Sequence, residues 1–134
     1  MDHTLAYHVT VLYREFMAYT SQRLQQLGLS FGLLFLVVYV GKHPGCTQAE
    51  LTGALGLDWG YSQRSITRLV EGGFLIRCKE GRAYHLTLSW LGERAFQVSH
   101  QVFFDWDEAF LAPLTGAEQE QLLQLLGKIK GEHT

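Results

Sequence analysis

The sequence predicts a mainly α-helical (α+β) fold: a winged helix-turn-helix lobe with flanking helices toward both ends of the chain. Two observations predict this class. Six segments carry apolar residues at helical spacing, bounded by capping residues or glycines. Between the fourth and the fifth of them, residues 74–88 alternate around a short glycine turn, which is typical of a β-hairpin. We therefore expect a single domain over residues 1–134, with the winged lobe at 30–88 and flanking helices at 1–28 and 89–134.

The first two helices are predicted from their apolar patterns and their end signals. Residues 4–27 form the first helix, and Gly28 ends it. The apolar stripe of this helix consists of Leu5, Leu12, Phe16, Tyr19 and Leu27. Ser30 caps the second helix, which runs from Phe31 to about Lys42 and is apolar nearly all round. A helix of this kind belongs in the core of the domain.

Capping residues also mark the third and fourth helices. Thr47 and Glu50 have the spacing of a capping box, which opens a short helix through about Leu55. Asp58 caps the fourth helix, which continues to about Glu71 before two glycines stop it.

The hairpin follows directly, in two alternating runs. In the first run, Phe74, Ile76 and Cys78 alternate with Leu75, Arg77 and Lys79. We expect Cys78 to pack on the apolar side of this strand. The second run covers residues 83–88, after the turn at residues 80–81.

Two further helices complete the chain. Ser89 caps a long helix from Trp90 to about Leu111, which ends near Pro113. Thr115 and Glu118 form a second capping-box pattern. The helix that it opens carries an apolar stripe of Leu122, Leu126 and Ile129.

Composition excludes several classes of protein. The chain has 134 residues, is 47% hydrophobic and has a net charge of −2, so it is neither disordered nor uniformly basic. The two cysteines fit no metal spacing. The most apolar run, residues 29–40, is about half the roughly 20 residues that span a bilayer, and no leader pattern is present. We expect a cytoplasmic protein with no membrane partner and no bound metal.

One face of the fourth helix has the chemistry of a DNA-reading surface. Spacings of three and four residues bring together Gly60, Gln63, Arg64, Thr67 and Arg68. Arginine binds guanine O6 and N7 or a phosphate, and glutamine reads adenine. A helix of this width fits the major groove, with the preceding helix crossing the backbone. The alternative is an ordinary solvated helix face.

The distribution of charge favours the DNA-binding alternative. Residues 63–94 hold six of the 11 basic residues and three acidic ones, although the whole chain is acidic. The basic residues of the hairpin are Arg77, Lys79 and Arg82. A local basic excess beside a polar helix is what phosphate binding requires.

Several motifs of the sequence resemble the MarR family of bacterial transcription regulators. They are Thr47-Gln48-Ala49-Glu50-Leu51, Leu55-Gly56-Leu57-Asp58, the stretch from Arg68 to Arg77 that includes Gly72-Gly73-Phe74-Leu75-Ile76, Leu86-Thr87-Leu88, and Gly92. The resemblance implies a homodimer that binds a pseudo-palindromic operator in double-stranded DNA, usually as a repressor released by a small ligand or by oxidation. It places Arg64 and Arg68 on the recognition helix and Arg82 on the wing.

Two features depart from the family pattern. The wing is short and lacks the usual Asp-x-Arg, which puts its reach into the minor groove in doubt. The fourth helix begins Trp59-Gly60-Tyr61, where small hydroxyl residues are commoner. We interpret Trp59 as a packing residue and leave the role of Tyr61 open. The candidate DNA contacts are Thr47, Gln48, Tyr61, Ser62, Gln63, Arg64, Thr67, Arg68, Arg77, Lys79 and Arg82.

The flanking helices suggest a dimer and an effector. Their apolar stripes would leave a large exposed patch on a monomer, unless they fold back onto one core. The candidate effector pocket consists of Tyr7, His8, Trp90, Phe103 and Trp106. Flat rings there would suit a small aromatic or tetrapyrrole effector, with core packing as the alternative and no cofactor required.

The remaining candidates concern redox chemistry and catalysis. Cys46 precedes a predicted helix N-terminus, where a thiolate is stabilised, so it is the redox candidate; a small buried hydrophobe is the alternative. We find no phosphate loop, carboxylate pair with a base or nucleophile elbow, and we expect no enzyme. The competing function is a winged helix that contacts only other proteins.

Overall fold

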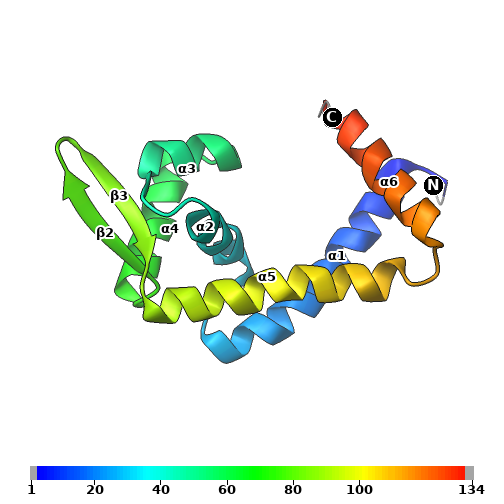
Figure 1. Ribbon diagram of the computed structural model, residues 1–134, viewed down its shortest axis with the longest axis horizontal. Helices are drawn as coiled ribbons and strands as arrows, with labels where there is room; N and C mark the ends of the chain where they lie inside the picture. Colours follow the sequence, from blue (N-terminus) through cyan, green and yellow to red (C-terminus); the bar gives the residue numbers. More distant parts are fainter. Residues whose placement is uncertain (1–2, 132–134) are drawn as a thin grey trace. The chain divides into compact units, whose positions relative to one another are not determined.

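The computed structural model describes residues 3–131 (Figure 1). Its elements are α1 (Leu5–Leu24), the short 3-10 helix η1 (Gln25–Leu27), α2 (Phe31–Lys42), β1 (Cys46–Thr47), α3 (Gln48–Leu55), α4 (Trp59–Glu71), β2 (Leu75–Glu80), β3 (Ala83–Leu88), α5 (Trp90–Leu111) and α6 (Gly116–Ile129). The predicted winged helix-turn-helix class is confirmed. The chain divides into two compact units, Met1–Val102 and Phe103–Thr134, and the division falls within α5.

Capping residues begin and end α1 and η1 as predicted, whereas Ser30 holds the N-cap position of α2 without a capping hydrogen bond from its side chain among the described residues. Thr4 Oγ1 accepts a hydrogen bond from the Tyr7 amide at the start of α1, and Gly28 ends η1 with φ +72°. α2 forms the centre of the first unit: Leu34, Val37 and Val40 are fully buried. Figure 1 shows α3, α4 and the β2–β3 hairpin gathered around this helix.

The sheet has three antiparallel strands in the order β1-β3-β2, one more than the predicted hairpin. β1 is only two residues long, and Cys46 pairs with Leu86 and Thr47 with His85. A two-residue strand has no alternating pattern to detect. Thr47 also caps α3, because its Oγ1 accepts from the Glu50 amide at 3.1 Å. The sheet therefore holds the start of α3 beside the hairpin.

The buried face of β2 is the opposite of the predicted one. Leu75 is buried, whereas Ile76 is 47% exposed and Cys78 is exposed. The expectation that Cys78 packs on an apolar side is therefore wrong. The cause is the register: Leu75 pairs with Leu88, so this pair covers the core where β2 contacts α4.

The first turn of α5 is fixed against the hairpin. Ser89 Oγ accepts from the Gly92 amide at 2.9 Å, and it donates to the carbonyl of Gly73 at 2.5 Å and, at the longer distance of 3.1 Å, to that of Phe74. A Cβ on Gly92 would clash with that same carbonyl oxygen. Only glycine allows the helix to approach the hairpin this closely.

The second unit contains the end of α5 and α6. The predicted capping box is present in full: Thr115 Oγ1 accepts from the Glu118 amide, and the Glu118 carboxylate accepts from the Thr115 amide at 2.9 Å. Gln119 Nε2 donates to the carbonyls of Leu111 and Leu114, which ties α6 to the preceding turn.

Within residues 3–131, no single helix is both long and apolar enough to cross a membrane. Leu5–Leu27 and Gly32–Lys42 reach that length and composition only as a pair, which is bent by 73°.

Candidate nucleic-acid interface

The two faces of α4 differ as the sequence predicts. Ser62, Ser65, Ile66 and Leu69 are buried against the lobe, and Asp58 caps the helix by accepting from the Tyr61 amide at 3.1 Å. On the other face Gln63, Arg64 and Arg68 are exposed and Thr67 is half-buried. Together with Arg77 of β2, these four residues line a shallow cleft of about 440 Å³. The structure thus places three guanidinium groups around one surface.

Gly60 leaves room for the Arg64 side chain on this face. A Cβ at Gly60 would lie 3.2 Å from Arg64 Nη1 and 3.2 Å from Asp58 Oδ2. The guanidinium therefore lies back along the first turn of α4. A larger residue at position 60 would displace it.

Arg77 links the hairpin to α4. Its Nη2 donates to Thr67 Oγ1 at 3.2 Å, and its Cζ lies 5.8 Å from the centre of the Tyr84 ring. Lys79 Nζ lies at the same distance from that ring and is exposed. Arg82 is exposed just beyond the turn at Gly81, whose φ is +64°. The Arg77 guanidinium is therefore hydrogen-bonded to Thr67 in the free protein, whereas the side chains of Lys79 and Arg82 are exposed to solvent.

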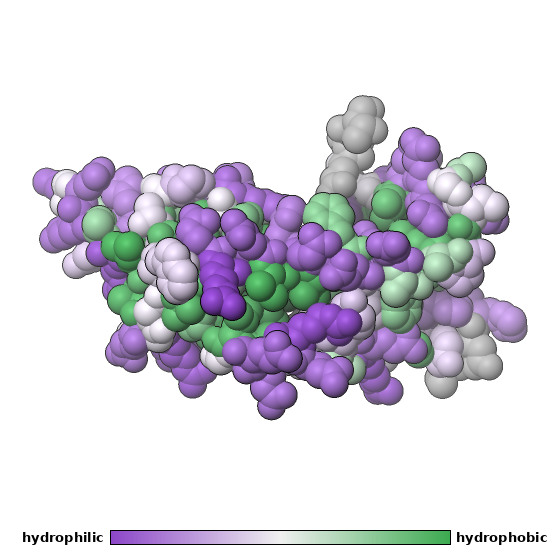
Figure 2. All heavy atoms as spheres, turned by 60° about the horizontal axis from the view of Figure 1, so that its bottom comes forward, coloured by the Kyte–Doolittle hydropathy of each residue, from purple (hydrophilic) through white to green (hydrophobic). Residues whose placement is uncertain are grey.

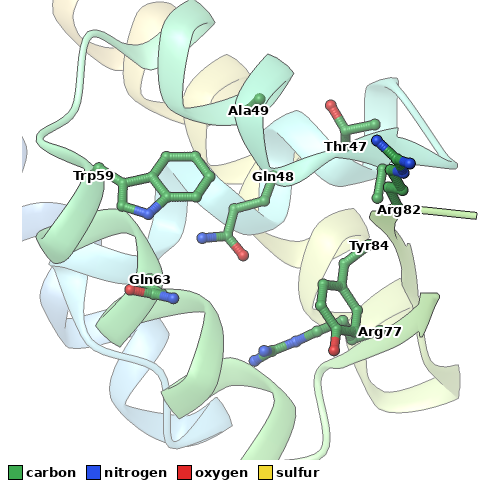
Figure 3. Close-up of a pocket in the computed structure, with 9 residues that line it drawn as sticks. Thr47, Gln48, Ala49, Trp59, Gln63, Arg77, Arg82 and Tyr84 are labelled. Carbon is green, nitrogen blue, oxygen red and sulfur yellow. The ribbon is translucent and has the colours of Figure 1, made fainter.

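A second cleft, of about 380 Å³, lies between the start of α3, the start of α4 and the hairpin (Figure 3). It is lined by Thr47, Gln48, Ala49, Trp59, Gln63, Arg77, Arg82, Ala83 and Tyr84. The Gln48 side chain extends into it between Trp59 and Tyr84. Tyr84, which is 45% exposed, was not among the predicted site residues. The sequence signal that could have identified Tyr84 is its place as a large aromatic residue in the alternating run at residues 83–88.

One predicted DNA contact, Ser62, lies in the core, and another, Tyr61, is 40% exposed at the start of α4. Ser62 is fully buried, with its Oγ 2.7 Å from Thr52 Oγ1, so the prediction that it contacts DNA is wrong. Its position on the core side of α4 determines this. The Tyr61 hydroxyl reaches back to α2, where it would lie 3.3 Å from a Cβ on Gly32. Trp59 remains 50% exposed and forms a wall of the second cleft, so it is only partly a packing residue.

Comparison with known proteins identifies the family. No protein-family model matches the sequence. The HTH-type transcriptional regulator BilQ of Clostridium symbiosum is 41% identical over 139 aligned positions, which cover 99% of this chain and 96% of that protein. A solved MarR protein from Peptoclostridium difficile superimposes with a TM-score of 0.89 at 19% identity, covering 98% of this chain and 88% of that one.

This chain belongs to the MarR family of winged helix-turn-helix regulators. A MarR-family regulator from Listeria monocytogenes, solved with a 26mer DNA, shares the fold. It superimposes with a TM-score of 0.86 at 20% identity and covers 96% of this chain and 87% of that one.

The residues predicted for an effector pocket of this MarR-family chain are spread over both compact units. Trp90 is 78% exposed. Its position in the first turn of α5 leaves the ring in solvent. Tyr7 packs edge-on against His8 in the first unit, whereas Phe103 and Trp106 belong to the second. A pocket formed by these five residues stays a prediction.

Cys46 does not have the environment of a reactive thiolate. The side chain is 4% exposed, and burial raises the pKa of its thiol. The negative charge of Glu50 raises it further, against a smaller lowering by a backbone hydrogen bond. The expectation of a stabilised thiolate at the start of α3 is therefore wrong, because desolvation outweighs the helix terminus. Within residues 3–131, no cluster of three His, Cys, Asp or Glu residues suits a metal ion.

Proposed function

We propose that this protein is a dimeric, sequence-specific DNA-binding repressor that recognises a pseudo-palindromic operator. One observation carries the proposal: α4 exposes a polar face with two arginines, flanked by the basic residues of the hairpin. The relationship to an HTH-type transcriptional regulator over the full length supports it. So does the fold shared with a family member that was solved with DNA.

The side chains of α4 and the hairpin have different roles in DNA recognition. Arg64 and Arg68 are long, exposed donors that can bind guanine O6 and N7 as a fork, and Gln63 can pair with adenine. Thr67 already accepts a hydrogen bond from Arg77, so it positions the hairpin rather than reading a base. Lys79 and Arg82 are free of the helix and would hold phosphates beside the groove.

Exposed apolar side chains support dimerisation. On α1 they are Leu5, Val9, Leu12, Tyr13 and Met17, and on α6 they are Leu122, Leu123, Leu125, Leu126 and Ile129. Each of these side chains is at least 37% exposed. Figure 2 shows apolar side chains that reach the surface among polar ones on one face of the protein. A second subunit would cover such residues, and a two-fold axis would match a palindromic operator.

We further propose a small aromatic effector, bound at a site that includes Tyr7, His8, Trp90, Phe103 or Trp106, that weakens operator binding. Tetrapyrroles are one candidate class of such flat ligands. A regulator of this kind acts on the bacterial chromosome, so we place it in the cytoplasm.

An electrophoretic shift on the DNA upstream of the protein's own coding sequence tests the proposal. The parent should bind a discrete segment. Arg64→Ala and Arg68→Ala should each weaken binding by about 1–3 kcal/mol and relax the sequence preference. Arg14→Ala, an exposed arginine on α1, is the matched control and should bind like the parent. If both α4 variants bind as tightly as the control, the protein does not read DNA with α4, which leaves the protein-contact alternative.

A further inference from the structure

The cleft between α3, α4 and the hairpin contains a buried hydrogen-bond donor that finds no acceptor in the described part of the chain. Gln48 is only 8% exposed, and its Nε2 has no partner within residues 3–131. The side chain extends into the space between Trp59, Gln63 and Arg77 (Figure 3). Buried polar groups in proteins are nearly always paired, so an unpaired donor aimed into a cleft indicates a site for a hydrogen-bond acceptor.

Arg77 presents a second such donor from the opposite wall of this cleft. Its Nε is buried and also lacks a partner among the described residues. The guanidinium is held in place, because Nη2 donates to Thr67 and the plane lies near the Tyr84 ring. The ring and the threonine thus orient Arg77 without using its Nε.

The lining of the cleft defines the chemistry of the ligand. None of its nine residues is acidic, and two of them are arginines. The cleft also borders the first turn of α3, whose backbone amides and helix dipole favour negative charge and whose acidic residue, Glu50, is not part of the lining. These features favour a ligand with anionic oxygen acceptors.

The position of the cleft indicates the source of those oxygens. Gln63 and Arg77 line both this cleft and the one on the recognition face of α4. The two clefts are therefore neighbours on one surface. The major groove is about 12 Å wide, so a helix that lies in it has backbone phosphates at both edges.

We propose that this cleft binds one backbone phosphate of the DNA, clamped between Gln48 Nε2 and Arg77 Nε. The inference rests on the proposed function and names a ligand for one part of that interface. A clamp of this kind sets the register of α4 on the duplex and carries no base preference of its own. Gln48 is then a positioning residue that acts through the phosphate.

Neutral phosphate analogues test the clamp. Footprinting of the upstream DNA first defines the protected segment. Duplexes that carry a single methylphosphonate at each protected position are then titrated with the parent and with Gln48→Ala. At one position in each half-site the analogue should lower the DNA affinity of the parent protein by roughly tenfold, since a charge-assisted hydrogen bond is lost. Gln48→Ala should show a similar loss on native DNA and no further loss at that position.

Three comparisons keep the test decisive. Gln97→Ala, an exposed glutamine on α5, should behave like the parent at every position. Gln48→Glu places a negative charge against the phosphate and should lower the affinity for native DNA more than Gln48→Ala does. Part of that lost affinity should be recovered on the methylphosphonate duplex. Arg77→Lys keeps the charge but lacks Nε, and it should lose the same positional sensitivity. Thermal unfolding confirms that each variant is folded.

The outcomes separate this proposal from the proposed function. DNA binding by the parent with no position coupled to Gln48 overturns the clamp alone. Failure of the parent to bind DNA overturns both. Inorganic phosphate and benzoate are titrated in parallel at constant ionic strength, with tryptophan fluorescence as the signal. Binding of either anion that depends on Gln48, without coupling on DNA, makes the cleft a small-anion site and overturns the clamp.

Discussion

At the scale of single residues, Ser62 joins α4 to α3 through a directed hydrogen bond. Thr52 Oγ1 donates its one proton to the Gln48 carbonyl at 2.7 Å, so Ser62 is the donor in the 2.7 Å contact between the two hydroxyls. Ser62→Ala should lower the free energy of unfolding by about 1 kcal/mol, the typical value of one intramolecular hydrogen bond. Urea denaturation measures this change, and DNA affinity per folded molecule should stay the same.

A buried serine on α5 is the matched control for this prediction. Ser99 is fully buried, and its Oγ has no hydrogen-bond partner within residues 3–131. Ser99→Ala should therefore leave stability unchanged or raise it. Equal losses in the two variants, or a weakened DNA complex with Ser62→Ala, would contradict the role assigned to Ser62.

The two cysteines should differ in reactivity toward thiol reagents. The pKa of Cys46 is raised, so its thiol stays protonated at neutral pH, and the side chain is buried; Cys78 is exposed. Only the thiolate reacts. The Cys78→Ser variant keeps only Cys46, so its alkylation by iodoacetamide at pH 7.5 should be slow and should accelerate in urea. The Cys46→Ser variant keeps only the exposed Cys78 and should react rapidly in the native state. Fast reaction of native Cys78→Ser would show that Cys46 is an accessible thiolate after all. Mass spectrometry follows both reactions.

At the scale of elements, the packing of α5 on the hairpin depends on a missing side chain. Gly92→Ala would press a Cβ against the Phe74 carbonyl oxygen, so the melting temperature should fall by several degrees. Gly53→Ala on α3 meets nothing within 4 Å and should raise stability by roughly 0.5–1 kcal/mol. Calorimetry of both variants compares the two effects. An unchanged or higher melting temperature for Gly92→Ala would contradict the close approach.

The helices were predictable from the sequence because their signals are local. Asp58 and Thr115 each bond an amide three residues ahead, and such spacing is visible in the letters. The buried face of β2 was not predictable in this way, because the pairing of Leu75 with Leu88 determines it. β1 and the cleft around Gln48 likewise depend on contacts between segments far apart in the chain. The polar face of α4 was predicted, whereas Ser62 on its border was misassigned.

At the scale of the whole molecule, the exposed leucines of α6 should drive association. Leu126→Glu would place a charge among Leu122, Leu123 and Ile129 and should convert the proposed dimer into a monomer at micromolar concentration. Gln121→Glu, an exposed position on the same helix, adds the same charge and should leave the dimer intact. Sedimentation equilibrium gives the masses. A monomeric parent would remove the dimer from the proposed function.

The central claim is that the α4 face and the basic hairpin together form a sequence-specific DNA interface. Fluorescence anisotropy with the protected upstream duplex and a scrambled duplex of equal composition, over a series of salt concentrations, tests it most directly. The parent should prefer its own sequence by roughly a thousandfold or more at physiological salt, as specific DNA-binding proteins do. The logarithm of its affinity should fall linearly with the logarithm of salt, and Lys79→Ala should reduce that slope by about 1. Equal affinity for the two duplexes, or affinity that does not change with salt, would contradict the claim.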